Sequence, residues 1–134
     1  MTLMTAAALF TDHERFLATS GSQHALALDA GSDKTAPSPM ELLLVALCGC
    51  TGSDVVTILR KKREPFTSLE VRAEADRAPT PPRVFTTIRL TYRVGGKVSH
   101  KAVEDAVRLS KEKYCSVSAM LQATAAITAV IEYT

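Results

Sequence analysis

The longest apolar pattern in the chain covers residues 42–59, where hydrophobic or small residues occupy nearly every position. The residues before it are typical of a helix start, with a serine cap, a proline for the first turn and a glutamate that completes a capping box: Ser38, Pro39 and Glu41. The basic run 60–63 suits the negative end of the helix dipole, and Pro65 ends the helix. Because such a helix is apolar on most sides, it needs cover from a sheet and from a partner subunit.

Strand patterns lie on both sides of this helix. Residues 15–29 indicate two short strands around a Ser-Gly-Ser turn, and a proline-rich turn separates two longer strands after the helix. The elements predicted after the first helix are strands over 69–77 and 84–94, helices over 99–113 and 115–125, and a closing strand over 127–133. The order ββ-α-ββ-αα-β predicts an α+β fold with long antiparallel strands packed against helices, in a single domain over residues 1–134.

Composition narrows the choice of partners and location. The chain has 134 residues, of which 46% are hydrophobic and 22% charged, so it can bury a core. Its net charge of +2 is too small to favour nucleic acid or an anionic membrane as a partner. We expect no stretch long enough to span a bilayer, which takes roughly 18 apolar residues, and the first residues lack the basic leader of a secretory signal. These features predict a cytoplasmic protein without a membrane partner.

The three cysteines offer the most chemistry, and their odd number does not make a disulfide framework. Cys48 and Cys50 are two positions apart on the predicted helix, about 200° around its axis, so they point to nearly opposite sides. They therefore cannot form a strain-free disulfide with each other, and a zinc site that combines them with Cys115 is disfavoured. The three histidines have no metal-ligand spacing, so we expect no metal and no cofactor.

Each candidate site residue has a functional and a structural interpretation. Cys50 precedes the polar stretch 51–54, but a free cysteine is also a common buried small residue. Cys115 lies where one predicted helix ends and another begins, so either the helix dipole stabilises its thiolate or the residue serves as a cap. Glu41 either completes the capping box or provides a carboxylate near a thiol. Arg15 is either a solvated strand residue or a cation that holds a thiolate.

Four segments of the sequence resemble one known family. They are SPMELLL at 38–44, CTGSDVV at 50–56, PRVFT at 82–86 and EKYCSVS at 112–118. These segments, and the spacing between the two that contain cysteine, resemble the OsmC/Ohr family of osmotically inducible and organic-hydroperoxide-resistance proteins, and its OsmC-like branch in particular. The resemblance covers about residues 13–133. It implies an OsmC-like fold and an intertwined homodimer, in which two sheets wrap around buried central helices.

The resemblance also implies an activity. Active family members reduce organic hydroperoxides, and the matching positions make Cys50 the thiol that attacks the peroxide and becomes a sulfenic acid. Cys115 then corresponds to the thiol that resolves the sulfenic acid as a disulfide. An external dithiol reductant would restore both thiols, without a cofactor, in oxidative or osmotic stress defence. Cys48 has no counterpart role in the family.

Two positions depart from the hydroperoxide-resistance pattern. Those family members carry a glutamate ten residues before the reactive cysteine, where this chain has Met40, and Glu41 lies one residue further on, about 100° around the helix. The arginine that the family pairs with this glutamate corresponds most nearly to Arg15. An alternative function, from another class, is therefore a non-catalytic small-ligand-binding or stress-associated dimer on the same scaffold.

Overall fold

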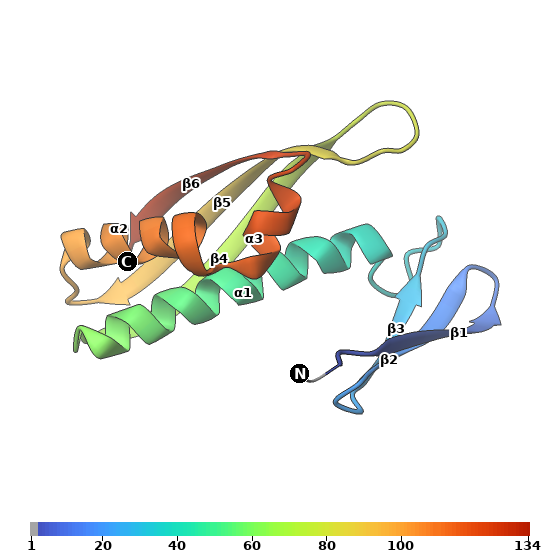
Figure 1. The fold of residues 1–134 in the computed structure, drawn as a ribbon, viewed down its shortest axis with the longest axis horizontal. Helices are drawn as coiled ribbons and strands as arrows, with labels where there is room; N and C mark the ends of the chain where they lie inside the picture. Colours follow the sequence, from blue (N-terminus) through green and yellow to red (C-terminus); the bar gives the residue numbers. More distant parts are fainter. Residues whose placement is uncertain (1–2) are drawn as a thin grey trace. The chain divides into compact units, whose positions relative to one another are not determined.

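The computed structural model describes residues 3–134, which form two compact units, residues 3–43 and Leu44–Thr134. The elements of the first unit are strands β1 (Ala6–Asp12), β2 (Arg15–Ser20) and β3 (Ala25–Asp29). They form an antiparallel sheet in the order β1-β2-β3 (Figure 1). The two strands expected over residues 15–29 are therefore confirmed. The strand β1 was not predicted, because its run of alanines lacks both the alternation and the β-branched residues of a typical strand.

Helix α1 (Pro39–Lys61) begins with the predicted capping box. The backbone N–H of Ser38 donates to Oε1 of Glu41 at 3.0 Å, and the backbone N–H of Glu41 donates to Oγ of Ser38 at 3.1 Å. Two orphan donors at the start of the helix are thus satisfied reciprocally. The helix ends just before Arg63, whose positive φ of 57° breaks the helical path.

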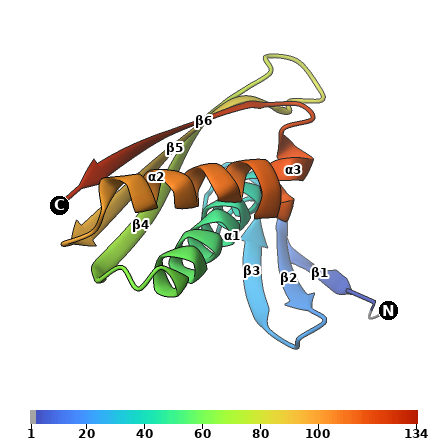
Figure 2. The same ribbon diagram turned by 60° about the vertical axis from the view of Figure 1, so that its left-hand side comes forward.

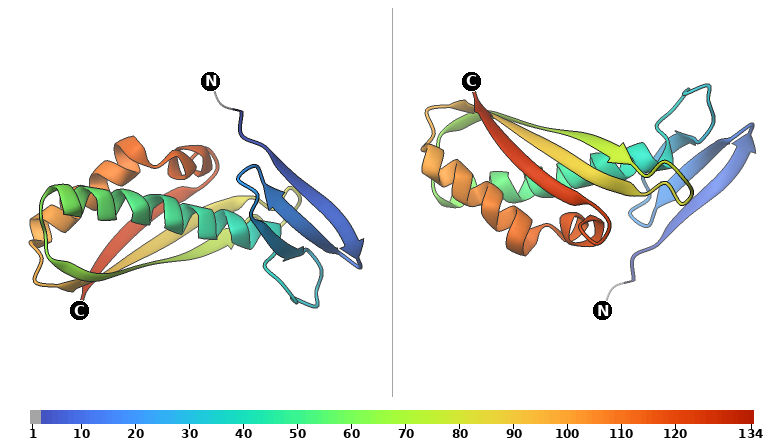
Figure 3. Two further views of the ribbon diagram at one scale, coloured as in Figure 1. Left: turned by 90° about the horizontal axis from the view of Figure 1, so that it is seen from below. Right: turned by 90° about the horizontal axis from the view of Figure 1, so that it is seen from above.

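The second unit contains a sheet that carries helices on one face. Strands β4 (Phe66–Arg77) and β5 (Phe85–Gly96) pair antiparallel, as expected, but β6 (Ala126–Tyr133) pairs parallel with β5. The closing strand is thus present as predicted, and the structure adds its parallel pairing. A parallel neighbour needs a crossover connection, and here helices α2 (His100–Leu109) and α3 (Ser116–Leu121) provide it. α1 and α2 lie over the same face of this sheet (Figures 2 and 3).

The crossover differs from the two helices predicted for it. The first helix continues beyond α2 as a π-helical segment, η1 (Ser110–Tyr114), and the second is only six residues long. Widened π-helical turns are rare and frequently lie at functional sites. The core between sheet and helices includes buried apolar side chains from α1, β5 and α2: Leu47, Val55, Leu59, Ile88, Leu90, Val94, Val103 and Ala106.

α1 corrects one expectation from composition. It has 23 residues, and its most apolar 18-residue window has a mean hydropathy of 2.0, so by length and composition it could cross a membrane. The expectation that no stretch reaches this length is wrong. Core helices of soluble proteins share the same property, and 28% of that window is buried within this one chain. The buried α1 residues lie mainly on one side of the helix, and Val45 is 62% exposed.

The packing of α1 against the sheet can be tested at Leu59, which has no exposed surface. Leu59→Ala removes buried apolar atoms and leaves a cavity, so the free energy of unfolding should fall by about 2–5 kcal/mol. Urea denaturation followed by circular dichroism measures this loss. The exposed neighbour Arg60 serves as control, since Arg60→Ala should change stability by less than about 0.5 kcal/mol. Equal effects of both substitutions would contradict the assigned packing.

Candidate thiol site

The two cysteines singled out by sequence both lie in the second unit. Cys50 lies on α1 and is half-buried, and Cys115, the residue that caps α3, is 3% exposed. The Cys50 side chain acts on the Cys115 thiol by hydrogen bonding and by charge, and both effects raise the pKa of Cys115. The segments that carry the two thiols lie close together, because Oγ1 of Thr51, the residue after Cys50, lies 2.8 Å from Oγ of Ser110, whose carbonyl oxygen accepts the Cys115 N–H at 2.8 Å. Cys50 and Cys115 are both free cysteines.

Burial determines the ionisation of Cys115. The environment raises its pKa from 9.0 to about 11, first because burial disfavours the charged thiolate. A backbone N–H of Ser118 donates to the Cys115 sulfur at 3.3 Å and lowers the pKa, but Cys50 and Asp54 oppose this effect. Cys115 is therefore the cap residue of α3, and the N–H group at the helix start lowers the pKa of its thiol less than burial raises it.

Cys48 occupies a different environment on α1. It lines an open, mainly apolar groove of about 620 Å³ between α1 and β4, beside Gly52 and Val71. Burial raises the pKa of the Cys48 thiol, so this cysteine is also protonated at neutral pH. Among residues 3–134, no three His, Cys, Asp or Glu side chains are close enough together to hold a metal ion.

A chain of buried hydroxyl groups lies next to the thiols, and sequence reasoning missed it. The Tyr92 hydroxyl lies 2.7 Å from Oγ1 of Thr51, which lies 2.8 Å from Oγ of Ser110. Ser110 in turn donates to Oδ2 of Asp54 at 2.8 Å. Because each hydroxyl has one hydrogen and the carboxylate only accepts, the direction is fixed: Tyr92 donates to Thr51, Thr51 to Ser110 and Ser110 to Asp54.

This hydroxyl chain connects directly to the segment that carries Cys115. Ser110 is the first residue of η1, and its carbonyl oxygen accepts the backbone N–H of Cys115 at 2.8 Å. Thr51 follows Cys50 directly on α1, and Asp54 lies one turn further along that helix. Ser118 adds an unusual feature, because its buried hydroxyl has no hydrogen-bond partner within the described residues. The thiol pair thus lies among satisfied polar groups and one unsatisfied hydroxyl.

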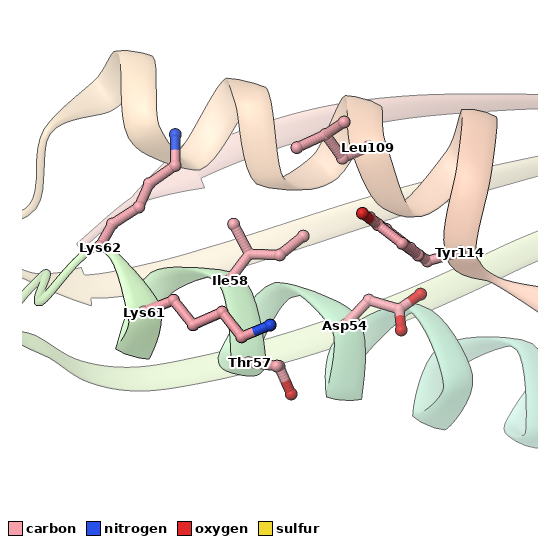
Figure 4. Close-up of a pocket in the computed structure, with 7 residues that line it drawn as sticks. All are labelled: Asp54, Thr57, Ile58, Lys61, Lys62, Leu109 and Tyr114. Atoms are coloured by element: carbon pink, nitrogen blue, oxygen red, sulfur yellow. The ribbon is translucent and has the colours of Figure 1, made fainter.

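A pocket of about 380 Å³ opens beside this network, along α1 (Figure 4). Asp54 forms part of its wall, so the pocket and the hydroxyl chain share one carboxylate. The rest of the lining combines apolar side chains with two lysines. The lining residues are Asp54, Thr57, Ile58, Lys61, Lys62, Leu109 and Tyr114. The periodicity of α1 places Thr57 and Lys61 on the same side of the helix as Cys50.

Glu41 and Arg15, the other two residues expected at the site, lie in the first unit with partners of their own. Glu41 is engaged in the capping box, and its hydrogen bonds with Ser38 lower its pKa. The Arg15 guanidinium donates to both carboxylate oxygens of Asp12, at 2.9 and 3.0 Å, which raises the pKa of Arg15. It also donates to Oγ1 of Thr35 at 3.3 Å. Both side chains are therefore charged at neutral pH.

The pKa of Cys115 can be tested by alkylation. Because only the thiolate reacts, labelling of Cys115 with iodoacetamide should keep accelerating with pH up to about 11. Cys50→Ala should shift this profile to lower pH, since Cys50 raises the pKa of Cys115. Site-resolved mass spectrometry provides the rates, and Cys48→Ala is the matched control that should leave the profile unchanged. A Cys115 titration midpoint below 9 would contradict the assignment.

Comparison with known proteins agrees with the fold and with the segments around both cysteines. The family model "OsmC-like protein" matches residues 31–130. The chain is 45% identical over 114 residues to "Protein YhfA" of Escherichia coli strain K12, covering 84% of this chain and 85% of that protein. Among solved structures, a hypothetical protein from Aquifex aeolicus is 31% identical with a TM-score of 0.87, covering 100% of this chain and 99% of that one.

A more distant solved structure has a more specific description. It is an organic hydroperoxide resistance protein from Legionella pneumophila, 15% identical with a TM-score of 0.75, covering 98% of both chains. This likeness shows a shared α+β fold. The family model covers most of the chain, and the relative in Escherichia coli covers more than two thirds of it. The chain described here is therefore a member of the OsmC-like protein family.

Proposed function

We propose that this protein is a thiol-dependent reductase of organic hydroperoxides that acts in oxidative or osmotic stress defence. The observation that carries the proposal is that Thr51, the residue after Cys50, hydrogen-bonds to Ser110, whose carbonyl oxygen accepts the backbone N–H of Cys115. Cys50 and Cys115 are far apart in sequence and lie on different elements, yet these two bonds join the segments that carry them. A peroxide-reducing thiol needs a second thiol nearby, because a sulfenic acid without one is oxidised further to sulfinic acid.

The proposed reaction has three balanced steps. First, the Cys50 thiolate attacks one peroxide oxygen, an S–O bond forms, the O–O bond breaks, and the leaving alkoxide takes up a proton to become an alcohol. Next, the Cys115 sulfur attacks the Cys50 sulfenic acid, the S–S bond forms, and the hydroxyl leaves with a proton as water. Finally, an external dithiol reduces the disulfide by exchange and is itself oxidised to a disulfide.

The thiolate at Cys50 requires a cation close by, and Arg15 is the residue we propose for this role. Its guanidinium is charged and already holds a carboxylate, that of Asp12, in a two-pronged geometry. Glu41 is proposed as the carboxylate that helps to orient such a cation, in place of the glutamate that Met40 replaces. In these roles Arg15 and Glu41 would need partners other than Asp12 and Ser38, to which they bond within the first unit.

We propose that the active form is a cytoplasmic homodimer and that residues 1–134 make a single OsmC-like domain. OsmC/Ohr family proteins are typically dimeric. Two apolar surfaces of this chain support the same state here. Val45 on α1 is 62% exposed, and the first sheet exposes large apolar side chains on all three strands: Leu9, Phe10, Leu17 and Leu26. Cover from a second copy would remove these surfaces from water.

Turnover tests the proposed peroxidase directly. Purified protein supplied with tert-butyl hydroperoxide and dihydrolipoamide should consume the peroxide, and Cys50→Ser should abolish turnover because serine cannot form a sulfenic acid. Cys115→Ser should stop turnover after one round and leave Cys50 as sulfinic acid. Cys48→Ser is the matched control on the same helix and should retain activity. Mass spectrometry that finds Cys50 unmodified after peroxide treatment of wild type would exclude the proposal.

The proposed role of Arg15 makes a separate prediction. A neighbouring cation lowers the pKa of an acid by about 1–3 units, so Arg15→Ala should reduce kcat/KM for the hydroperoxide by at least about tenfold at neutral pH. The loss should shrink at high pH, where a thiol ionises without a cation beside it. Arg72→Ala, at an exposed arginine on β4, is the matched control. A pH-independent loss would assign Arg15 a structural role instead.

The pocket beside α1 favours one alternative, a small-ligand-binding dimer without catalysis. Its volume of about 380 Å³ is within the range of small-molecule sites, and its walls combine apolar side chains with two lysines. Such a protein would bind an apolar molecule at this pocket with equal affinity in wild type and Cys50→Ser. Equilibrium dialysis with a fluorescent apolar anion, together with absence of peroxide turnover, would favour this function.

A further inference from the structure

The hydroxyl chain formed by Tyr92, Thr51, Ser110 and Asp54 joins the two elements that carry the thiols. None of its members reacts in the three steps proposed above. We infer that this chain is a positioning device for the thiol pair, and that Ser110 and Asp54 are positioning residues for Cys115. The inference rests on the proposed function, since it concerns the step in which the Cys115 sulfur reaches Cys50.

Ser110 is the residue that connects α1 to the segment carrying Cys115. Its side chain bonds to two residues of α1, while its carbonyl oxygen accepts the backbone N–H of Cys115. Ser110 has no exposed surface, so these bonds are formed away from water. A π-helical turn is a rare local widening of a helix, and here its first residue is anchored to α1. Fixing Ser110 to α1 therefore fixes the turn that ends at Cys115.

Asp54 determines the direction of the whole chain. As a carboxylate it can only accept, so it orders the hydrogens of Ser110, Thr51 and Tyr92 one after another. The bond from Ser110 is also charge-assisted and is stronger than one between neutral groups. Replacing Asp54 by a residue without an acceptor should leave the hydroxyl chain without a defined direction and loosen η1.

An electrostatic role of Asp54 on the thiols predicts the opposite effect. Its negative charge disfavours the Cys115 thiolate, so removing that charge would make Cys115 more reactive. A positioning role predicts that removing the acceptor slows the encounter of the two sulfurs. The two roles are therefore distinguished by whether disulfide formation becomes slower or faster when Asp54 is replaced.

The test uses a chemical oxidant in place of peroxide. Diamide accepts two electrons and two protons from a dithiol, so it forms the Cys50–Cys115 disulfide without any peroxidase step. In the full-length Cys48→Ser protein, Ser110→Ala and Asp54→Ala should each slow this disulfide by about tenfold, as expected for loss of a hydrogen bond to a charged group. Asp54→Asn keeps an acceptor and should restore the rate to within about threefold of the parent protein.

Separate alkylation measures whether the thiols themselves have changed. With Cys50 replaced by serine, iodoacetamide labelling of Cys115 should not slow in Asp54→Ala, because the substitution removes a negative charge. Ser53→Ala, at an exposed hydroxyl on the same helix, is the matched control and should leave the disulfide rate unchanged. Circular dichroism establishes that each variant is folded. If Ser110→Ala does not fold, Asp54→Ala alone provides the test.

Two results would overturn the inference. One is a disulfide rate in folded Asp54→Ala equal to or faster than that of the parent protein. The other is a slower rate in Asp54→Ala that Asp54→Asn fails to restore, which would mean general loosening. Failure of the proposed function would look different, because wild type would then form the disulfide with diamide but leave peroxide unreacted.

Discussion

Burial of α1 is the constraint on which the rest of the structure depends. A helix with almost no polar side has to be covered over most of its circumference, and the sheet β4-β5-β6 covers only one face of it. α2 packs beside it over the same sheet, and α1 keeps exposed apolar side chains such as Val45. The same burial places Cys50 half out of water and Cys115 almost fully out of it.

The environment of the thiols is therefore a compromise between protection and reactivity. A buried thiol stays protonated and inert until something stabilises its charge, and the pKa of Cys115, about 11, reflects this. The carboxylate of Asp54 adds to the effect rather than opposing it. A resting pair of this kind avoids indiscriminate oxidation. In the proposed function, a substrate or a cation that stabilises the negative charge of the thiolate would allow the pair to react.

Sequence reasoning predicted the features that local hydrophobic periodicity and helix caps determine. The capping box of Ser38 and Glu41, the strands of the first sheet after residue 15 and the order of the later elements follow from local patterns. The parallel pairing of β6 is a long-range property that its residues do not specify. The hydroxyl chain was missed for a related reason: Thr51, Tyr92 and Ser110 come from three separate elements, and only the tertiary fold brings them together. The Asp54 position one turn after Cys50 was the available signal.

The parallel crossover has a consequence for synthesis of the protein. Cys50 leaves the ribosome well before Cys115, and β6, which completes the sheet behind them, is made last. At about 5–20 residues per second, Cys50 spends several seconds on a nascent chain without its partner thiol. A sulfenic acid formed in that interval has nothing to resolve it within its own molecule. Damage to such a cysteine would then be most frequent in newly made chains, and the rate of translation would influence the yield of intact sites during stress.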